Sequence, residues 1–341
     1  MKICIFHPFS DQNQGYKMIL DGCTDVLHEV IGTDFEMLSC DTVHSELDLN
    51  VVDDYKEWRQ ALTKVLDFKP DIFVVTGIPW IWDMWEASKK YRIMTELVGS
   101  LDKGVKKIAM GIGSCLPLAP DSVSLYMLKD GKRKSLKEIF DLYNSFAFVS
   151  SRDSIAQKCF DEASINSLYS ISPSCFISIK PVMTDSGKPV LFFHNPLEGQ
   201  SKGVLDDYYI ADYITYQERF IKKYKPEVIV ATKEERIWCI SSGIENPHLE
   251  GDWQNWFPVL SKASFVVSGR VQGAIAAKLM GLQTYILPTD TRFLAATRIG
   301  AEPILPWGNL DNYGPGTDSQ SIFDFSAERE RIVERLKKVL Q

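Results

Sequence analysis

The sequence predicts an α/β protein with two domains, each built around a parallel β-sheet, and three observations carry this prediction. Short apolar runs rich in Val and Ile alternate with helical patterns along the chain, which is the order that βαβ units produce. The chain of 341 residues exceeds what one core usually holds, so two domains are expected. A segment rich in Pro and Gly at residues 179–189 is followed at once by a new strand pattern, and it is typical of a domain boundary.

The first half of the chain is expected to form an N-terminal domain of residues 1–180. Its apolar, β-branched runs predict strands at residues 2–7, 35–38, 72–76, 107–111, 146–150 and 168–171. Helical patterns lie between these runs, at residues 16–30, 53–68, 84–101, 135–143 and 154–162. This alternation favours a parallel sheet with crossover helices.

The same alternation restarts after the linker and predicts a C-terminal domain of residues 189–325. Strands are expected at residues 190–193, 228–231, 265–267 and 284–287, and helices at 206–224, 233–241, 274–280 and 292–299. We expect the carboxyl ends of both sheets to face a central cleft, where ligands of such sheets generally bind.

A last helix is expected at residues 327–340, within a terminal segment of residues 326–341. Its apolar stripe comprises Ile332, Val333, Leu336 and Leu340, and acidic and basic residues alternate around it. This pattern favours a packed amphipathic helix over a membrane anchor. We expect the segment to pack back on the N-terminal domain.

The composition indicates an ordinary globular protein, with 45% hydrophobic and 24% charged residues. A net charge of −7 argues against a nucleic-acid-binding protein. Seven cysteines without a CxxC spacing favour reduced thiols and a cytoplasmic location.

The N-terminal apolar run is too short for a signal peptide, and no stretch of the sequence is long and apolar enough to span a bilayer. The histidine and carboxylate spacings predict no metal site.

The segment from Ser264 to Gly281 carries the clearest sign of a binding site. An apolar run ends at Ser268, Arg270 follows in the turn, and Gly273 opens an Ala-rich helical pattern. A strand, a tight turn and a helix start together present unpaired N–H groups and a guanidinium to an anion. The alternative is an ordinary βα unit in which Arg270 makes a surface ion pair.

Four other sequence features could contribute to a site. Residues 9–16 contain Asn13 and Gly15, and they predict either an amide-lined loop or a capped βα loop. Residues 76–80 are predicted to form a second loop, which contains Gly77 and Trp80. Trp80, Trp82 and Trp85 would form a sugar-stacking wall or pack in the core.

The third feature, residues 111–115, contains Ser114 and weakly resembles a phosphate loop, but it lacks the Walker lysine. In the fourth, Arg152 lies in the turn at residues 150–154, where Asp153 or Ser154 could cap the next helix. His7 and His194 each end a predicted strand, so each is either a proton carrier or a structural residue.

These motifs, in their order and spacing, resemble the polysaccharide pyruvyl transferase family. Asn13-Gln14-Gly15 is similar to the family's early Asn-x-Gly loop, and Ser151-Arg152-Asp153 to its Arg-Asp motif. Ser268-Gly269-Arg270-Val271-Gln272-Gly273 is similar to its late Ser-x-Arg-Leu-His-Gly signature. The resemblance implies two Rossmann-like domains of the glycosyltransferase-B type, with the acceptor on the N-terminal domain and the donor on the C-terminal one.

The resemblance also implies an activity in polysaccharide biosynthesis, in which a pyruvyl group passes from phosphoenolpyruvate to a glycan or lipid-linked sugar. Phosphoenolpyruvate would be a co-substrate, with no other cofactor and at most peripheral membrane association. Arg152 and Arg270 would clamp its phosphate and carboxylate. The expected catalytic residues are Arg270, Gln272, His194 and His7. The expected substrate- and anion-binding residues are Asn13, Gly15, Gly77, Ser114, Arg152, Ser268, Gly273 and Arg292.

The chain departs from the family pattern at three positions. Gln272 replaces the histidine of the late motif, and glutamine does not titrate near neutral pH. Ser172-Pro173 replaces the usual Asp-Pro, and Thr76-Gly77-Ile78-Pro79 replaces the usual glycine-rich loop. Two alternatives therefore remain: a glycosyltransferase that uses a nucleotide-activated sugar, and a non-catalytic relative.

Overall fold

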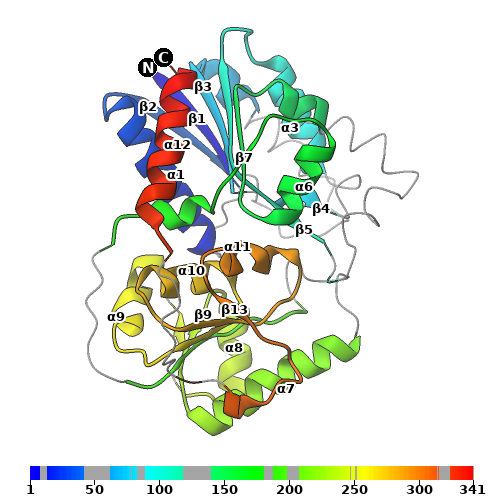
Figure 1. Ribbon diagram of the computed structural model, residues 1–341, viewed down its shortest axis with the longest axis vertical. Coiled ribbons are helices and arrows are strands. Elements are labelled where there is room, and N and C mark those ends of the chain that lie inside the picture. Colours follow the sequence, from blue (N-terminus) through cyan, green and yellow to red (C-terminus); the bar gives the residue numbers. More distant parts are fainter. Residues whose placement is uncertain are drawn as a thin grey trace. The chain divides into compact units, whose positions relative to one another are not determined.

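The structure is a computed structural model. It describes residues 1–7, 14–41, 62–77, 79–82, 89–116, 118, 140–179, 187–197, 207–245, 247–249, 252–312, 314 and 323–340. The chain divides into two compact units (Figure 1). Unit 1 comprises Met1–Ser10, Ile19–Phe176 and Ser326–Gln341, and unit 2 comprises Asp11–Met18 and Ile177–Phe325. The main division thus falls between Phe176 and Ile177, beside the linker segment of the sequence.

Unit 1 is built on a parallel sheet in the order β2-β1-β3-β5-β6-β7, and β4 pairs with β5 beyond this path. The strands are β1 (Lys2–His7), β2 (Glu36–Asp41), β3 (Ile72–Thr76), β4 (Pro79–Trp82), β5 (Lys106–Cys115), β6 (Phe148–Ser151) and β7 (Leu168–Tyr169). The register pairs Ile3 with both Met37 and Ile72. All of β3 is buried, as expected of a parallel strand covered on both faces.

The helices of unit 1 cover both faces of this sheet (Figure 1). They include α1 (Gln14–Ile31), α3 (Lys89–Ser100), α6 (Ser154–Glu162) and α12 (Phe325–Leu340). Alternate residues of the strands, such as Phe73 and Val75 of β3, join a core with Leu97 of α3 and Phe160 of α6. This alternation follows from the two-residue period of a strand, so the sheet supplies a core on each side.

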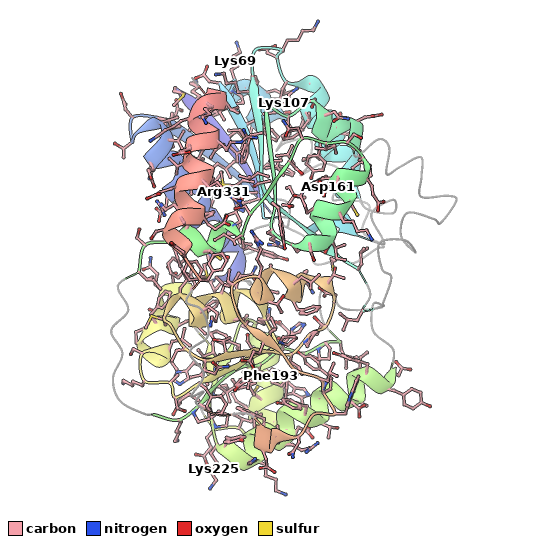
Figure 2. The ribbon with its side chains drawn as sticks, in the orientation of Figure 1. Lys69, Lys107, Asp161, Phe193, Lys225 and Arg331 are labelled. Atoms are coloured by element: carbon pink, nitrogen blue, oxygen red, sulfur yellow. The ribbon has the colours of Figure 1, made fainter. Side chains whose placement is uncertain are left out.

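The last helix, α12, belongs to unit 1 and is bonded to it along its length. Its apolar residues Ile332 and Leu336 are buried. Lys106 of β5 donates to the carbonyls of Val339 and Leu340, at 3.1 and 2.7 Å. Arg331, labelled in Figure 2, donates to the carbonyl of Tyr169 in β7.

Two loop predictions in unit 1 are wrong. Residues 111–115 form the end of β5 instead of a phosphate loop, and the segment predicted as a loop at 76–80 runs into β4. The two glycines of β5 are explained by close packing. A Cβ on Gly111 would lie 2.2 Å from the Pro173 ring, and one on Gly113 would lie 2.4 Å from Arg152 Nε. The stacking wall of Trp80, Trp82 and Trp85 lies outside the side chains that the structure describes.

Unit 2 contains a second parallel sheet, in the order β10-β9-β8-β11-β12-β13. The strands are β8 (Val190–Phe192), β9 (Glu227–Val230), β10 (His248–Leu249), β11 (Val266–Ser268), β12 (Thr284–Ile286) and β13 (Glu302–Pro303). The helices are α7 (Asp207–Tyr224), α8 (Lys233–Ser241), α9 (Trp256–Leu260), α10 (Val271–Leu279) and α11 (Leu294–Thr297). The core is aromatic, and Tyr213, Tyr216 and Phe220 of α7 belong to the same cluster as Phe193 and Phe265, which flank β8 and β11.

None of the helices that the structure describes combines the length and the apolar composition needed to cross a bilayer.

Candidate functional site

Several of the expected site residues gather at one edge of the sheet in unit 2. His194 follows β8, Arg270 follows β11 and Arg292 follows β12. β8, β11 and β12 are neighbours in a parallel sheet, so their carboxyl ends lie along the same edge. The clustering therefore follows from the topology of the sheet.

Glu235 is the residue around which this cluster is organised, although the sequence reasoning did not select it. Its side chain is 0% exposed. The carboxylate accepts bonds from the backbone N–H of Asn195 at 3.0 Å and of Ala231 at 3.1 Å. It also accepts from Arg270 Nη2 at 2.5 Å and lies 3.3 Å from His194 Nδ1. Four partners from three strand ends converge on one carboxyl group.

The local sequence explains why Glu235 lies there. Thr232 is the N-cap of α8, and its hydroxyl accepts from the N–H of Glu235 at 3.1 Å. A Thr followed three residues later by Glu is a capping-box pattern, which could have marked Glu235 in the sequence. In this structure the carboxylate accepts from the N–H of Ala231, one residue before the N-cap residue that a capping box usually bonds. The same carboxylate also binds the other members of the cluster.

The charges in this cluster are tightly coupled. Burial by itself would raise the pKa of Glu235, but the positive charge of Arg270 and the bonds from His194 and Arg270 outweigh burial and lower the pKa to about 2. Burial lowers the pKa of His194, and the bond to Glu235 offsets this only in part. We infer an ionised Glu235 beside a neutral imidazole that donates through Nδ1, which leaves Nε2 as an acceptor.

A second ion pair, between Asp290 and Arg292, lies at the same edge. The buried carboxylate of Asp290 accepts from the backbone N–H of Arg292 at 2.9 Å, from its Nε at 2.7 Å and from its Nη2 at 2.5 Å. Burial would raise the pKa of Asp290, but the Arg292 charge outweighs burial and lowers it. His194 contributes to the same shift, so the two ion pairs are electrostatic neighbours.

The cluster is therefore electrically balanced rather than cationic, since each arginine faces a buried carboxylate. The side chains of Arg270 and Arg292 are 16% and 21% exposed, so each keeps a small accessible area. Arg270 makes one further bond, from Nε to the carbonyl of Phe193 (labelled in Figure 2) at 3.4 Å. A guanidinium carries five N–H donors, so the cluster offers directed donors to a ligand without a large excess of positive charge.

The turn between β11 and α10 holds Arg270 in place. Ser268 Oγ accepts from the N–H of Arg270 at 3.1 Å and donates to its carbonyl at 2.6 Å. Arg270 is the N-cap residue of α10, which begins at Val271, earlier than the expected start at 274. Gly273 therefore lies inside the first turn, where a Cβ would meet the Phe192 ring at 2.5 Å. Gln272 lies beside it and is half-buried.

Two expected residues of unit 1, Ser114 and Arg152, lie next to each other. Asp153 is the N-cap of α6, and it accepts from the N–H of Ser114 at 2.8 Å and from its hydroxyl at 2.9 Å. Arg152 is buried against Gly113. Burial raises the pKa of Asp153, while Arg152 acts in the opposite direction. These contacts place both residues around the start of α6, and their role in ligand binding stays a prediction.

The remaining expected residues lie on other elements. His7 ends β1, is buried, and forms a 2.6 Å bond between Nε2 and Ser39 Oγ. Burial lowers its pKa to about 4. Gly77 has φ +62°, and a Cβ there would lie 2.2 Å from Ile19 Cγ2. Gly15 is in the first turn of α1, and Asn13 lies outside the described residues.

The predicted clamp joins residues of different units. Arg152 belongs to unit 1 and Arg270 to unit 2, so their convergence on one ligand stays a prediction. Within the described ranges, no group of three or more His, Cys, Asp or Glu side chains is arranged to hold a metal ion.

No protein-family model and no curated protein matches the sequence, whereas solved structures resemble the chain over almost its full length. UDP-GlcNAc 2-epimerase from Methanocaldococcus jannaschii, in complex with UDP-GlcNAc and UDP, has a TM-score of 0.58 at 11% identity, covering 99% of this chain and 100% of that one. The S. aureus MnaA–UDP co-structure has a TM-score of 0.57 at 11% identity, covering 99% and 96%.

A third structure, UDP-GlcNAc 2-epimerase from Neisseria meningitidis bound to UDP-GlcNAc, has a TM-score of 0.52 at 13% identity, covering 99% of this chain and 100% of that one. At such low identity these likenesses show the fold alone. The fold is the glycosyltransferase-B type, with two Rossmann-like units that each contain a parallel sheet.

Proposed function

We propose that the protein is an enzyme that acts on a carbohydrate and binds a nucleotide-activated sugar at the carboxyl edge of the sheet in unit 2. The observation that carries the proposal is Arg270, which Glu235 holds at the start of α10 with 16% of its side chain exposed. The full-length structural neighbours support the donor class, because UDP or UDP-GlcNAc is bound in those structures.

The turn before α10 suits a phosphate group. The first N–H groups of a helix lack partners within the helix, and the helix dipole favours negative charge there. Arg270, the N-cap residue of the helix, adds a planar donor group, and arginine forms paired bonds to phosphate oxygens. In glycosyl transfer the leaving group is a nucleoside phosphate, whose developing charge such donors stabilise.

His194 suits the role of base in the same reaction. Its lowered pKa keeps the imidazole neutral at pH 7, the form in which a base acts, and the bond from Nδ1 to Glu235 orients the ring. A carbohydrate hydroxyl becomes a better nucleophile when a neighbouring base takes its proton. In this proposal Glu235 positions both His194 and Arg270.

Pyruvyl transfer from phosphoenolpyruvate is the second candidate, and the ordered motifs around Arg152 and Arg270 favour it. This reaction needs an acid that protonates the enol carbon. Gln272 does not titrate, and burial lowers the pKa of both His7 and His194, so few molecules carry a protonated imidazole at pH 7. Glycosyl transfer from a nucleotide sugar does not require the protonation of a carbon atom, so we rank the nucleotide sugar first.

Calorimetry with UDP, several nucleotide sugars and phosphoenolpyruvate tests the proposal. Arg270→Ala alone would strand the buried Glu235 charge, so the informative variant is Arg270→Ala combined with Glu235→Gln. We expect this double variant to lose nucleotide binding, while Arg236→Ala, which removes an exposed arginine beside Glu235 in the sequence, binds as the wild type does. Unchanged nucleotide affinity in the double variant would place the site elsewhere, and binding of phosphoenolpyruvate without nucleotides would favour pyruvyl transfer.

A further inference from the structure

We propose that Trp307, supported by Tyr209, is the platform on which the nucleobase of the donor stacks. This inference rests on the proposed function, which supplies the nucleotide, and it adds the residue that would bind the base. It concerns the segment after β13, for which the sequence analysis predicted no role.

Trp307 is a large aromatic side chain on the surface, with 61% of its area exposed. It is held in place, because its ring packs edge to face against Tyr209 with the centroids 6.0 Å apart and the planes at 90°. An indole that is both exposed and held by a neighbour loses little freedom when a second ring stacks on it.

Tyr209 connects this platform to the candidate site. Its hydroxyl donates to the carbonyl of Pro288 at 2.6 Å, and Pro288 is two residues before Asp290. The Asp290 charge also contributes, after burial, to a raised pKa of Tyr209. Both observations place the Tyr209 ring beside the loop that carries the Asp290–Arg292 pair.

A row of rings continues from Tyr209 to the Glu235 cluster. The Tyr209 and Tyr213 centroids are 6.4 Å apart, and those of Tyr213 and His194 are 6.3 Å apart. Tyr213 also donates to the carbonyl of Gly269 at 3.5 Å, next to Arg270. Trp307 therefore lies along the same edge of unit 2 as the two arginines.

The two arginine–carboxylate pairs and the Trp307 ring would suit a ligand with two chemically different ends. The arginine pairs suit phosphate oxygens, and an exposed indole suits a flat ring that can stack on it. A nucleotide carries both groups on one molecule, joined by a ribose. Phosphoenolpyruvate has no ring, so Trp307 would have no role in binding it.

The test compares nucleotides with a ligand that has no base. Calorimetry would measure the affinity of UDP, GDP, ADP and inorganic pyrophosphate for the wild type, Trp307→Ala and Trp307→Phe. We expect Trp307→Ala to weaken at least one nucleoside diphosphate by about tenfold to a hundredfold, the usual range for base stacking, and to leave pyrophosphate unchanged. Trp307→Phe should retain most of the affinity, because a flat ring remains.

Two controls separate stacking from damage to the fold. Leu305→Ala removes another exposed apolar side chain, 49% exposed and two residues away, and should leave all affinities unchanged. Nucleotide binding should quench tryptophan emission in the wild type and less so in Trp307→Phe. If Trp307→Ala lost the same affinity for pyrophosphate as for nucleotides, the effect would be structural and would overturn the inference.

The remaining outcomes distinguish this inference from the proposed function. Nucleotide binding that depends on Arg270 but not on Trp307 would overturn the platform and leave the proposed function standing. If the affinity for a sugar 1-phosphate depended on Trp307 and the affinity for nucleotides did not, the indole would bind a sugar. That result would also overturn the inference. If no nucleotide binds to the wild type, both proposals fail together.

Discussion

Arg270 and Glu235 form an ion pair that joins the turn after β11 to the first turn of α8. Arg270 Nη2 donates to Glu235 Oε1 at 2.5 Å, and the carboxylate has no exposed area. The two residues are 35 positions apart in sequence, so the pair forms only when the sheet of unit 2 is assembled. Its removal should therefore affect both folding and ligand binding.

Replacement of Glu235 by alanine should destabilise unit 2 strongly. The change leaves the Arg270 guanidinium without its carboxylate and two backbone N–H groups without their acceptor. Removal of one partner from a buried pair typically costs about 3–5 kcal/mol. Urea denaturation would measure the loss. Glu234→Ala, on the exposed neighbour, is the matched control and should change the unfolding free energy by less than about 0.5 kcal/mol.

Acid should destabilise the protein through Glu235 between about pH 4.5 and pH 2. The folded pKa of Glu235 is lowered from 4.5 to about 2, so its stabilisation is present above pH 4.5 and is lost as the pH falls through the folded pKa. A shift of this size corresponds to about 3 kcal/mol. Denaturation of the wild type and of Glu235→Gln at pH 6 and pH 3 would show it, because the variant should have a smaller pH dependence. An identical pH dependence would contradict the prediction.

Protonation of His7 should destabilise the protein at a higher pH than protonation of Glu235 does. Burial lowers its pKa from 6.5 to about 4, so the folded state resists the protonation that the unfolded chain accepts. The stabilisation linked to His7 is then fully present above pH 6.5, and the free energy of unfolding decreases by up to about 3 kcal/mol as the pH falls to 4. NMR titration of the His7 ring would measure the pKa directly. His7→Gln, which keeps a hydrogen-bonding side chain near Ser39, should remove this part of the pH dependence.

Gly113→Ala should destabilise unit 1, although the change adds only a methyl group. A Cβ at Gly113 would lie 2.4 Å from Arg152 Nε, so the arginine or the strand must move, at a cost of about 1–3 kcal/mol. Gly99→Ala in α3 is the matched control, because no atom lies within 4 Å of its Cβ. That change should instead stabilise the helix by about 0.5–1 kcal/mol. Thermal unfolding of the two variants should therefore shift in opposite directions.

Much of the fold could be predicted from apolar patterning. The sequence predicted β1, β3, α6 and α8 with the bounds that the structure has, because each combines a clear period with a turn or a cap. It missed β4, β10 and β13. β10 and β13 contain only two residues, too few to show a period. β4 begins with Pro79 and follows a glycine, a sequence that is typical of a loop.

The candidate site was predicted only in part, for a physical reason. His194 and Arg270 were expected there because each follows a predicted strand, whereas Ser268 and Arg292 were expected from the family resemblance. Glu235 lies inside a helix, and the pattern around it explains a cap without showing which distant arginine the carboxylate meets. The interaction depends on strand order, which places β8 between β9 and β11. Strand order is a property of the tertiary fold, which local patterns do not encode.

The pairing of each arginine with an internal carboxylate would have a consequence for the binding and release of the proposed nucleotide. The net charge around a phosphate bound at this edge would be close to zero, so long-range electrostatic attraction would contribute little to binding. The affinity would then come from hydrogen bonds and van der Waals contacts. Binding should therefore vary only weakly with ionic strength. A spent nucleotide would also be released readily, because no excess of positive charge retains it.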